Sequence, residues 1–182
     1  MAAQANEVGG DDGHDSPMHR LVAARRSLLF GLCLLPSLLF VLPVAGQSVT
    51  DGDTIRHSGV AVRLWGIDAA ELDQSCADGW AAGRLAREHL AGLMRDRAIT
   101  CEPRTTDRYG RVVALCRADG EDLGAAMVSA GMAWAFIRYS QDYARQEEAA
   151  ESKGLGVHGH DCERPWAHRA RQRRGPRSHG LR

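Results

Sequence analysis

DGDTIRHSGVAVRLWGIDAAE, residues 51–71, is the segment around which the rest of the chain can be arranged. Its middle part, residues 60–65, alternates apolar and less apolar side chains, which is typical of a strand with one buried face. Arg63 and Asp68 are five positions apart, so a regular strand would direct them to opposite faces. If both serve one site, the chain must bend between them, and Gly66 permits that bend.

Further strands and helices are expected on both sides of this segment. The predicted strands are Val44–Thr50 and Thr54–His57 around the Asp51-Gly52 turn, then Ala98–Pro103 and Arg111–Ala118 as a hairpin with the loop TTDRYG. Helical spacing predicts Gly79–Asp96, Glu121–Ala130 and Gln141–Lys153, the last with Ser140 as its N-cap. This order predicts an α+β fold built on a small antiparallel barrel.

The N-terminal part has the composition of an export segment. Residues 1–17 are polar and are expected to form a disordered extension, which makes Met18 a candidate for the true start. Residues 18–46 join a basic beginning to an apolar run, the pattern of a signal peptide or an uncleaved N-terminal anchor. Membrane attachment would then run through residues 27–44. Either alternative predicts a domain outside the cytoplasm, periplasmic or secreted.

The cysteines agree with an oxidising compartment. Beyond Cys33 in the apolar run, the even number left suggests pairing. Cys101 and Cys116 lie at similar distances from the hairpin tip, so antiparallel pairing would set them opposite each other and predicts a disulfide. Cys76 and Cys162 are then left as a pair by elimination. The alternative is that the cysteines are free and buried as small apolar residues.

The formal net charge of +0 hides an uneven distribution. Residues 47–163 carry 13 Lys and Arg against 19 Asp and Glu, a net charge of −6, whereas residues 164–182 carry seven Arg and no acid. We therefore predict an acidic domain over residues 44–157 and a C-terminal extension over 158–182 with a basic disordered tail. Such a tail either binds nucleic acid through counterion release or is a solvated end, and the sequence leaves both open.

The polar residues suggest phosphate chemistry. Carboxylates that can hold a hard cation, beside arginines that can reach a phosphate, are what phosphodiester hydrolysis requires. Taken singly, each has a plainer interpretation, such as an aspartate that caps a turn or an arginine on a strand surface. His158, His160, Asp161 and Cys162 suggest zinc only weakly, because tetrahedral sites usually draw their ligands from two separated pairs. A polar loop with a disulfide cysteine is the preferred interpretation there.

DGDT, RLWGIDAAE and TDRYGR together resemble the staphylococcal nuclease (thermonuclease) family. The resemblance covers roughly residues 44–156, and its ELDQSC and GMAWAFIRYSQDY stretches are similar to exported bacterial members. Pro165-Trp166 and Arg169 resemble the C-terminal extension of those members. The resemblance implies an OB-fold, a five-stranded β-barrel with three helices.

The resemblance also assigns roles by position. Asp53 and Asp68 match calcium-binding carboxylates, and Ala69 matches a position whose backbone carbonyl completes the ligand set. The remaining matches are Arg63, Arg111 and Glu71 as catalytic residues, Arg108 and Tyr109 at a terminal phosphate, and Tyr139 at the base site. Two positions depart from the family pattern: Ala70 replaces a common proline and so removes a φ constraint before Glu71, and Ile137 replaces a second aromatic residue.

The resemblance therefore implies an exported, Ca²⁺-dependent nuclease that cleaves DNA and RNA with little sequence specificity and leaves 3′-phosphates; we expect a monomer. The main alternative is a non-catalytic member of the fold that binds nucleic acid or a partner protein. Such binders typically lose site carboxylates or arginines, which are all present here. An envelope-anchored structural protein is a third possibility, but it explains none of the polar residues.

Overall fold

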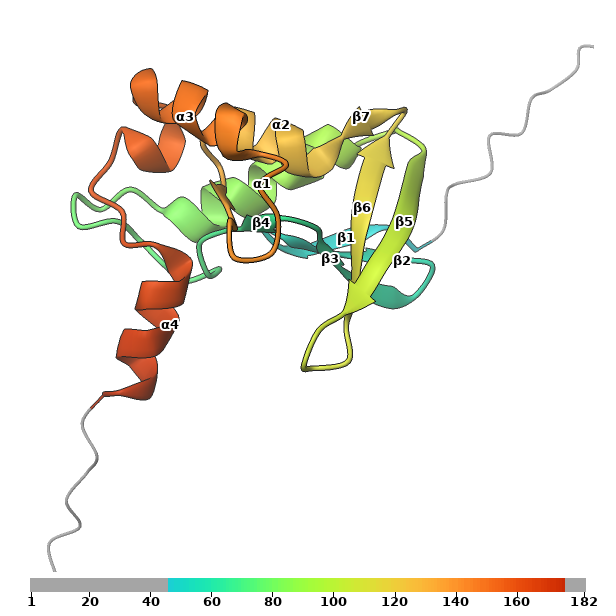
Figure 1. Cartoon of the computed structure of the whole chain (residues 1–182), viewed down its shortest axis with the longest axis horizontal. Helices are drawn as coiled ribbons and strands as arrows, with labels where there is room; N and C mark the ends of the chain where they lie inside the picture. The colour runs from blue at the N-terminus through green and yellow to red at the C-terminus, as the bar shows by residue number, and fades with distance from the viewer. Residues whose placement is uncertain (1–45, 176–182) are drawn as a thin grey trace, which may run out of the picture. The chain divides into compact units, whose positions relative to one another are not determined.

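The computed structural model describes residues 46–175 (Figure 1). The predicted N-terminal extension, nearly all of the export segment and the end of the tail lie outside the described residues. The strands are β1 (Ser48–Asp51), β2 (Thr54–His57), β3 (Val60–Leu64), β4 (Ile67–Asp68), β5 (Ile99–Thr106), β6 (Val112–Ala118), β7 (Glu121–Asp122) and β8 (Trp134–Ala135). The helices are α1 (Ala82–Met94), α2 (Leu123–Ser129), α3 (Ala144–Ser152) and α4 (Pro165–Arg173), with a 3-10 turn at Gly156–His158.

The strands form a six-stranded sheet in the order β1-β2-β3-β6-β5, in which β7 pairs with β6, and a separate pair β4-β8. The α+β class is confirmed. The expected counts differ in the described residues, which form a six-stranded sheet that does not close and four helices where five strands and three helices were expected. The antiparallel expectation fails at one pair, because β3 and β6 run parallel. An alternating pattern is the same for parallel and antiparallel neighbours, so it could not reveal the β3–β6 pairing.

The predicted bend at Gly66 separates β3 from β4. Gly66 has φ +73°, a left-handed conformation that other residues rarely adopt. The turn ends β3 at Leu64 and starts β4 at Ile67, where the chain leaves the large sheet to pair with β8. The bend is what lets Arg63 and Asp68 reach the same point in space.

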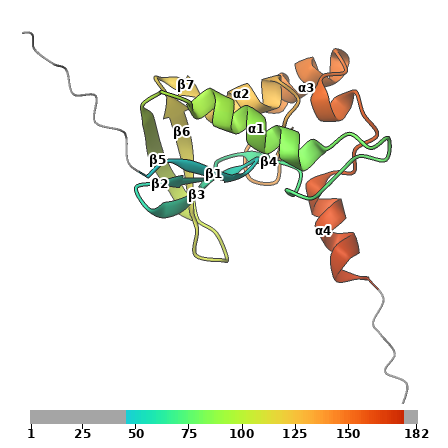
Figure 2. The ribbon, with the colours of Figure 1, turned by 180° about the vertical axis from the view of Figure 1, so that it is seen from behind.

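Helix α1 presents an apolar face to the sheet and a charged face to solvent. Its buried residues include Ala82, Ala86, Leu90 and Met94, at a spacing of one helical turn. The helix packs against β1 and lies in front of the sheet in Figure 2. It begins later than the predicted Gly79, because Gly79 has φ +89° and cannot be helical there.

The two following helices also begin later than predicted. Helix α2 starts at Leu123, where the Asp122 carboxylate caps it by accepting a hydrogen bond from the Ala125 N–H (3.1 Å). Helix α3 starts at Ala144, and the predicted cap Ser140 instead accepts from the Asp142 N–H (3.0 Å) in the turn before it. Helical spacing located both helices, but the first residue of each depends on the turn that precedes it.

Both predicted cysteine pairs are disulfides in the structure. Cys101 and Cys116 face each other in the β5–β6 register, as the hairpin spacing predicted. Cys76 is bonded to Cys162, which joins the loop before α1 to the segment before α4. The second bond closes a long stretch of chain and fixes the start of the C-terminal extension.

The C-terminal extension contains a helix where a disordered tail was expected. Helix α4 covers Pro165–Arg173, with Arg164 at the N-cap and a buried Pro165 in the first turn, a position that suits proline. Local composition predicted disorder because the segment is strongly basic. Contacts with distant parts of the chain, described below, hold it in place.

In the part of the chain from residue 46 to 175, no helix is both long and apolar enough to cross a membrane. The apolar run of residues 27–44 lies outside that part. Export and membrane attachment therefore stay predictions.

Gly83 and Gly92, both in α1, provide a matched test of the packing beneath this helix. A Cβ at Gly83 would collide with the Glu71 carbonyl oxygen, whereas a Cβ at Gly92 would meet nothing within 4 Å. We expect Gly83→Ala to lower the free energy of unfolding by about 1–3 kcal/mol. Gly92→Ala should raise it by about 0.5–1 kcal/mol, as alanine is the better helix former. Urea unfolding followed by circular dichroism measures both, and equal effects would contradict the packing described.

Candidate active site

The first predicted metal ligand, Asp53, lies in the turn between β1 and β2. Its carboxylate is buried, and Asp51 supports the turn by accepting a hydrogen bond from the Asp53 N–H (3.1 Å). A Cβ at Gly52 would come within 2.7 Å of the Cβ atoms of Ala69 and Ala86. Glycine is therefore needed for the turn to press against the segment that carries Asp68.

Arg63 joins the two predicted ligands. Its Nη2 atom lies 2.8 Å from Asp53 Oδ2 and 2.7 Å from Asp68 Oδ1. Asp68 is fully buried, and Asp53 also accepts a hydrogen bond from the Thr54 hydroxyl (2.8 Å). The two carboxylates thus converge on one positively charged side chain, an ion pairing that the sequence analysis did not predict.

Burial dominates the electrostatics of this trio. It raises the pKa of Asp53 and of Asp68, although the neighbouring arginines oppose this effect. Burial alone would lower the pKa of the Arg63 guanidinium, but the two carboxylates outweigh it and raise that pKa. A pair of buried carboxylates therefore needs a cation between them, and in the structure Arg63 provides it.

The same arrangement suits a divalent cation. Both carboxylate oxygens contact one nitrogen at 2.8 and 2.7 Å, so they are close enough to approach one ion at the 2.3–2.6 Å typical of Ca²⁺. Among residues 46–175 no group of three or more His, Cys, Asp or Glu side chains could hold a metal ion. Two carboxylates would need backbone carbonyls and water as further ligands, which Ca²⁺ accepts. The backbone of Ala69, whose carbonyl was the third predicted ligand, lies beside this pair, and its N–H donates to Asp53 Oδ2 (3.3 Å).

Arg111 is not in contact with these carboxylates. Its Nε lies 2.7 Å from Asp107 Oδ2, and Asp107 Oδ1 accepts the backbone N–H groups of Tyr109 and Arg111 (both 2.9 Å). Asp107 thereby organises the β5–β6 hairpin loop. The guanidinium groups of Arg108 and Arg111 lie 4.9 and 5.7 Å from the centre of the Tyr109 ring.

Glu71 is held by an arginine that the sequence analysis gave no role. Arg169 on α4 places Nη1 2.7 Å from Glu71 Oε1 and Nη2 2.6 Å from Asp68 Oδ2. Burial would lower the pKa of Arg169, but the bonds to these two carboxylates raise it. The only signal in the sequence was the resemblance of Pro165-Trp166 and Arg169 to a C-terminal extension, which carried no role for the arginine.

These residues line one cleft of about 1010 Å³. The cleft brings together every predicted site residue except Asp68, whose buried carboxylate lies behind Arg63 and Arg169. It also contains residues that the sequence analysis missed: Phe136, Arg138, Trp166, Arg169 and Arg173. A smaller depression of about 410 Å³ beside α3 holds none of the predicted site residues.

Aromatic side chains form one wall of the cleft. The rings of Phe136 and Tyr139 are 5.1 Å apart, and those of Phe136 and Trp166 are 5.6 Å apart. Tyr109 and Tyr139 are exposed, with 67% and 66% of their surface accessible. Ile137 is also exposed but does not line the cleft, so the aromatic surface comes from its neighbours. Exposed rings beside arginines are typical of surfaces that bind single-stranded nucleic acid.

Comparison with known proteins agrees with this architecture. Residues 61–158 match the model of the family described as staphylococcal nuclease homologue, and the chain belongs to that family. It is 37% identical over 126 residues to the succinoglycan biosynthesis protein ExoI of Rhizobium meliloti, covering 63% of this chain and 64% of that protein. It is also 32% identical to an uncharacterized endonuclease of Haemophilus influenzae, covering 60% and 62% of the two chains. The chain thus spans less than two thirds of the length of these relatives.

A third relative is covered more fully. The micrococcal nuclease of Shigella flexneri is 30% identical over 170 residues, which cover 82% of this chain and 94% of that protein. The similarity therefore covers more of the chain than the family segment of residues 61–158.

The Arg63 pair can be tested through stability. Arg63→Gln leaves two buried carboxylates without their common partner, so we expect it to lower the free energy of unfolding by about 3 kcal/mol or more. Arg84→Gln removes the same charge from an exposed pair with Glu88 and should cost less than about 0.5 kcal/mol. Urea unfolding without added metal compares the two variants, and similar losses would show that Arg63 does not compensate buried charge.

Proposed function

We propose that this chain is a Ca²⁺-dependent nuclease that hydrolyses phosphodiester bonds of DNA and RNA with little sequence specificity and leaves 3′-phosphate ends. The observation that carries the proposal is the convergence of Asp53 and Asp68 on Arg63, with Glu71 beside them in an aromatic and arginine-lined cleft. Relatives named endonuclease and micrococcal nuclease support it.

The cation site would be formed by Asp53, Asp68 and the carbonyl of Ala69. Bound Ca²⁺ would supply positive charge beside the reacting phosphate and open positions for its oxygens. In the structure Arg63 pairs with both carboxylates, and a guanidinium released from them would be able to turn toward the phosphate.

The arginines then neutralise charge on the phosphate. Hydrolysis passes through a state with additional negative charge on the non-bridging oxygens, and a planar guanidinium can bind two of them at once. Arg63 is next to the cation site, and Arg111 reaches the cleft from the hairpin. Arg111 must exchange its contact with Asp107 for one with substrate, an exchange between two anionic partners.

Glu71 acts on the attacking water. Its carboxylate is partly exposed in the cleft, so it can accept a proton from a water or orient that water in line with the leaving oxygen. Arg108 and Tyr109 would contact a terminal phosphate, and Tyr139 would stack on a base.

The two disulfides support a place of action outside the cytoplasm, where such bonds persist. We propose a periplasmic or secreted monomer, attached to the membrane through residues 27–44 if the N-terminal segment is retained.

Nuclease activity provides the direct test. Single-stranded DNA should be digested with Ca²⁺ and left intact with excess chelator. Glu71→Gln keeps the shape of the side chain but removes the base, so we expect kcat to fall by about 100-fold or more. Full activity in excess chelator would contradict the role of the cation, and an unchanged rate in Glu71→Gln would contradict the role of the carboxylate.

Calcium binding can be measured without substrate. Ligand that binds only the folded state raises Tm, so Ca²⁺ should stabilise the wild-type protein. Asp68→Asn removes a buried ligand and should abolish this shift, whereas Asp73→Asn changes an exposed acid in the next loop and should keep it. Differential scanning calorimetry with Ca²⁺ and with Mg²⁺ checks both variants, and loss of the shift in Asp73→Asn alone would place the site elsewhere.

A non-catalytic binding module is the second candidate. It is favoured by the ion pairs of Arg111 with Asp107 and of Glu71 with Arg169, because each side chain already has a charged partner within the protein. Tight binding of an oligonucleotide that stays uncut in Ca²⁺ would support this candidate over the nuclease.

A further inference from the structure

We propose that Arg169 is a positioning residue of this site, which holds the Glu71 carboxylate beside Asp68 in the geometry needed for attack on the phosphate. The inference rests on the proposed nuclease function and extends it to the C-terminal helix. Neither the family segment, which ends at residue 158, nor the residue matches made from the sequence includes a role for Arg169.

The geometry is that of a bridge between two carboxylates. Arg169 directs Nη1 to Glu71 Oε1 (2.7 Å) and Nη2 to Asp68 Oδ2 (2.6 Å), with a further contact from Nη1 to Asp68 Oδ1 (3.2 Å). Charge-assisted bonds of this length are strong, and the planar fork fixes direction as well as distance. Because Asp68 is fully buried and also bonds to Arg63, it provides the reference point to which Glu71 is tied.

Glu71 needs such support because little else fixes it. It follows β4 in a loop, and Ala70 before it leaves φ unconstrained where a proline would fix it. Its backbone N–H donates to Gln74 Oε1 (3.2 Å). Among the described residues, Arg169 is the one whose side chain bonds to the Glu71 carboxylate. A glutamate has several rotamers, and a displacement of about 1 Å at a reacting group can lower a rate by about 100-fold.

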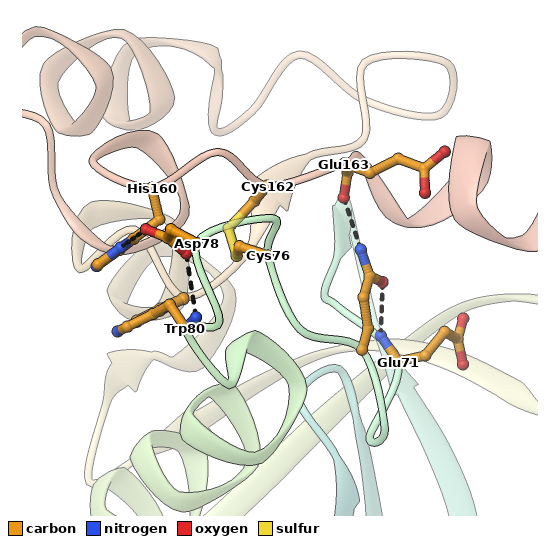
Figure 3. The surroundings of a disulfide bond; sticks show 8 residues. Glu71, Cys76, Asp78, Trp80, His160, Cys162 and Glu163 are labelled. Atoms are coloured by element: carbon orange, nitrogen blue, oxygen red, sulfur yellow. Dashed lines mark hydrogen bonds and ion pairs between the residues drawn. A yellow bond between two sulfur atoms is a disulfide. The ribbon is translucent and has the colours of Figure 1, made fainter.

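The segment before α4 is anchored to the loop that carries Glu71. Figure 3 shows the Cys76–Cys162 disulfide together with Glu71 and Glu163. The Gln74 side chain accepts from the Glu71 N–H and donates from Nε2 to the Glu163 carbonyl oxygen (2.7 Å). The disulfide and the Gln74 hydrogen bonds together therefore set the distance between Glu71 and the start of α4.

Packing of its first turn fixes the position of helix α4. Pro165 is buried, and the Trp166 ring lies 5.6 Å from that of Phe136 in the cleft wall. Arg169 follows Trp166 by three positions, so the two side chains lie on the same side of α4. These contacts explain how one arginine reaches two carboxylates from the far end of the chain.

A double-mutant cycle tests the proposal. In the full-length protein with Ca²⁺, Arg169→Gln should lower kcat on single-stranded DNA by about 100-fold and change KM by less than about threefold. In a Glu71→Gln background it should cause little further loss, because its effect acts through Glu71. Arg169→Lys keeps the charge but lacks the fork and should recover only part of kcat. Arg174→Gln removes the same charge from the exposed C-cap of α4 and serves as the matched control, for which we expect an unchanged kcat.

Calcium affinity provides a readout apart from activity. Removing a positive charge that contacts Asp68 should tighten Ca²⁺ binding by about tenfold in isothermal titration calorimetry. Loss of Ca²⁺ binding in Arg169→Gln would overturn the proposal, since the residue would then maintain the metal site.

The kinetic outcomes separate the proposal from the function on which it rests. Additive losses in the cycle, or a raised KM with unchanged kcat, would overturn the role of Arg169 and leave the nuclease intact. If Arg169→Gln fails to fold, the cycle is run with Arg169→Lys, and an additive loss there has the same meaning. A wild-type protein that cuts no nucleic acid in Ca²⁺ would overturn the proposed function and the role of Arg169 with it.

Discussion

The burial of two aspartates around one cation is the constraint on which the arrangement of the site depends. Isolated carboxylates are costly to bury, so Asp53 and Asp68 can occupy the interior only if a positive group stands between them. Arg63 meets that requirement with a single nitrogen. The turn at Gly52 and the bend at Gly66 are the backbone features that make this meeting possible, because one brings Asp53 inward and the other returns Asp68 to the side of Arg63.

Much of this could be predicted from local patterns. Alternation located β2 and β3, helical spacing located α1, and equal distances from the hairpin tip identified the Cys101–Cys116 pair. The need for a bend between Arg63 and Asp68 followed from strand geometry alone. These features succeed because each is decided within a few residues, or by a symmetry that a hairpin imposes.

What could not be predicted depends on contacts between distant segments. The parallel pairing of β3 with β6 joins strands separated by α1 and β5, and no local pattern distinguishes it from an antiparallel pairing. The partner of each charged side chain is likewise undetermined by composition: Arg111 was expected near the metal site and is bound to Asp107 four positions away. Helix α4 was expected to be disordered because its composition is basic, yet its Arg169 pairs with two carboxylates of the site.

The uneven charge of the chain gives this last point a physical basis. An acidic domain with a net charge of −6 over residues 47–163 attracts a C-terminal segment that carries arginines and no acid. Attraction alone would give many loose arrangements, since exposed ion pairs contribute little. Three contacts select one of these arrangements: the disulfide to Cys76, the hydrogen bonds of Gln74 and the packing of Trp166. In that arrangement Arg169 pairs with a fully buried carboxylate. Charge thus explains why the segment approaches the site, and the covalent and apolar contacts explain why it stops at one place.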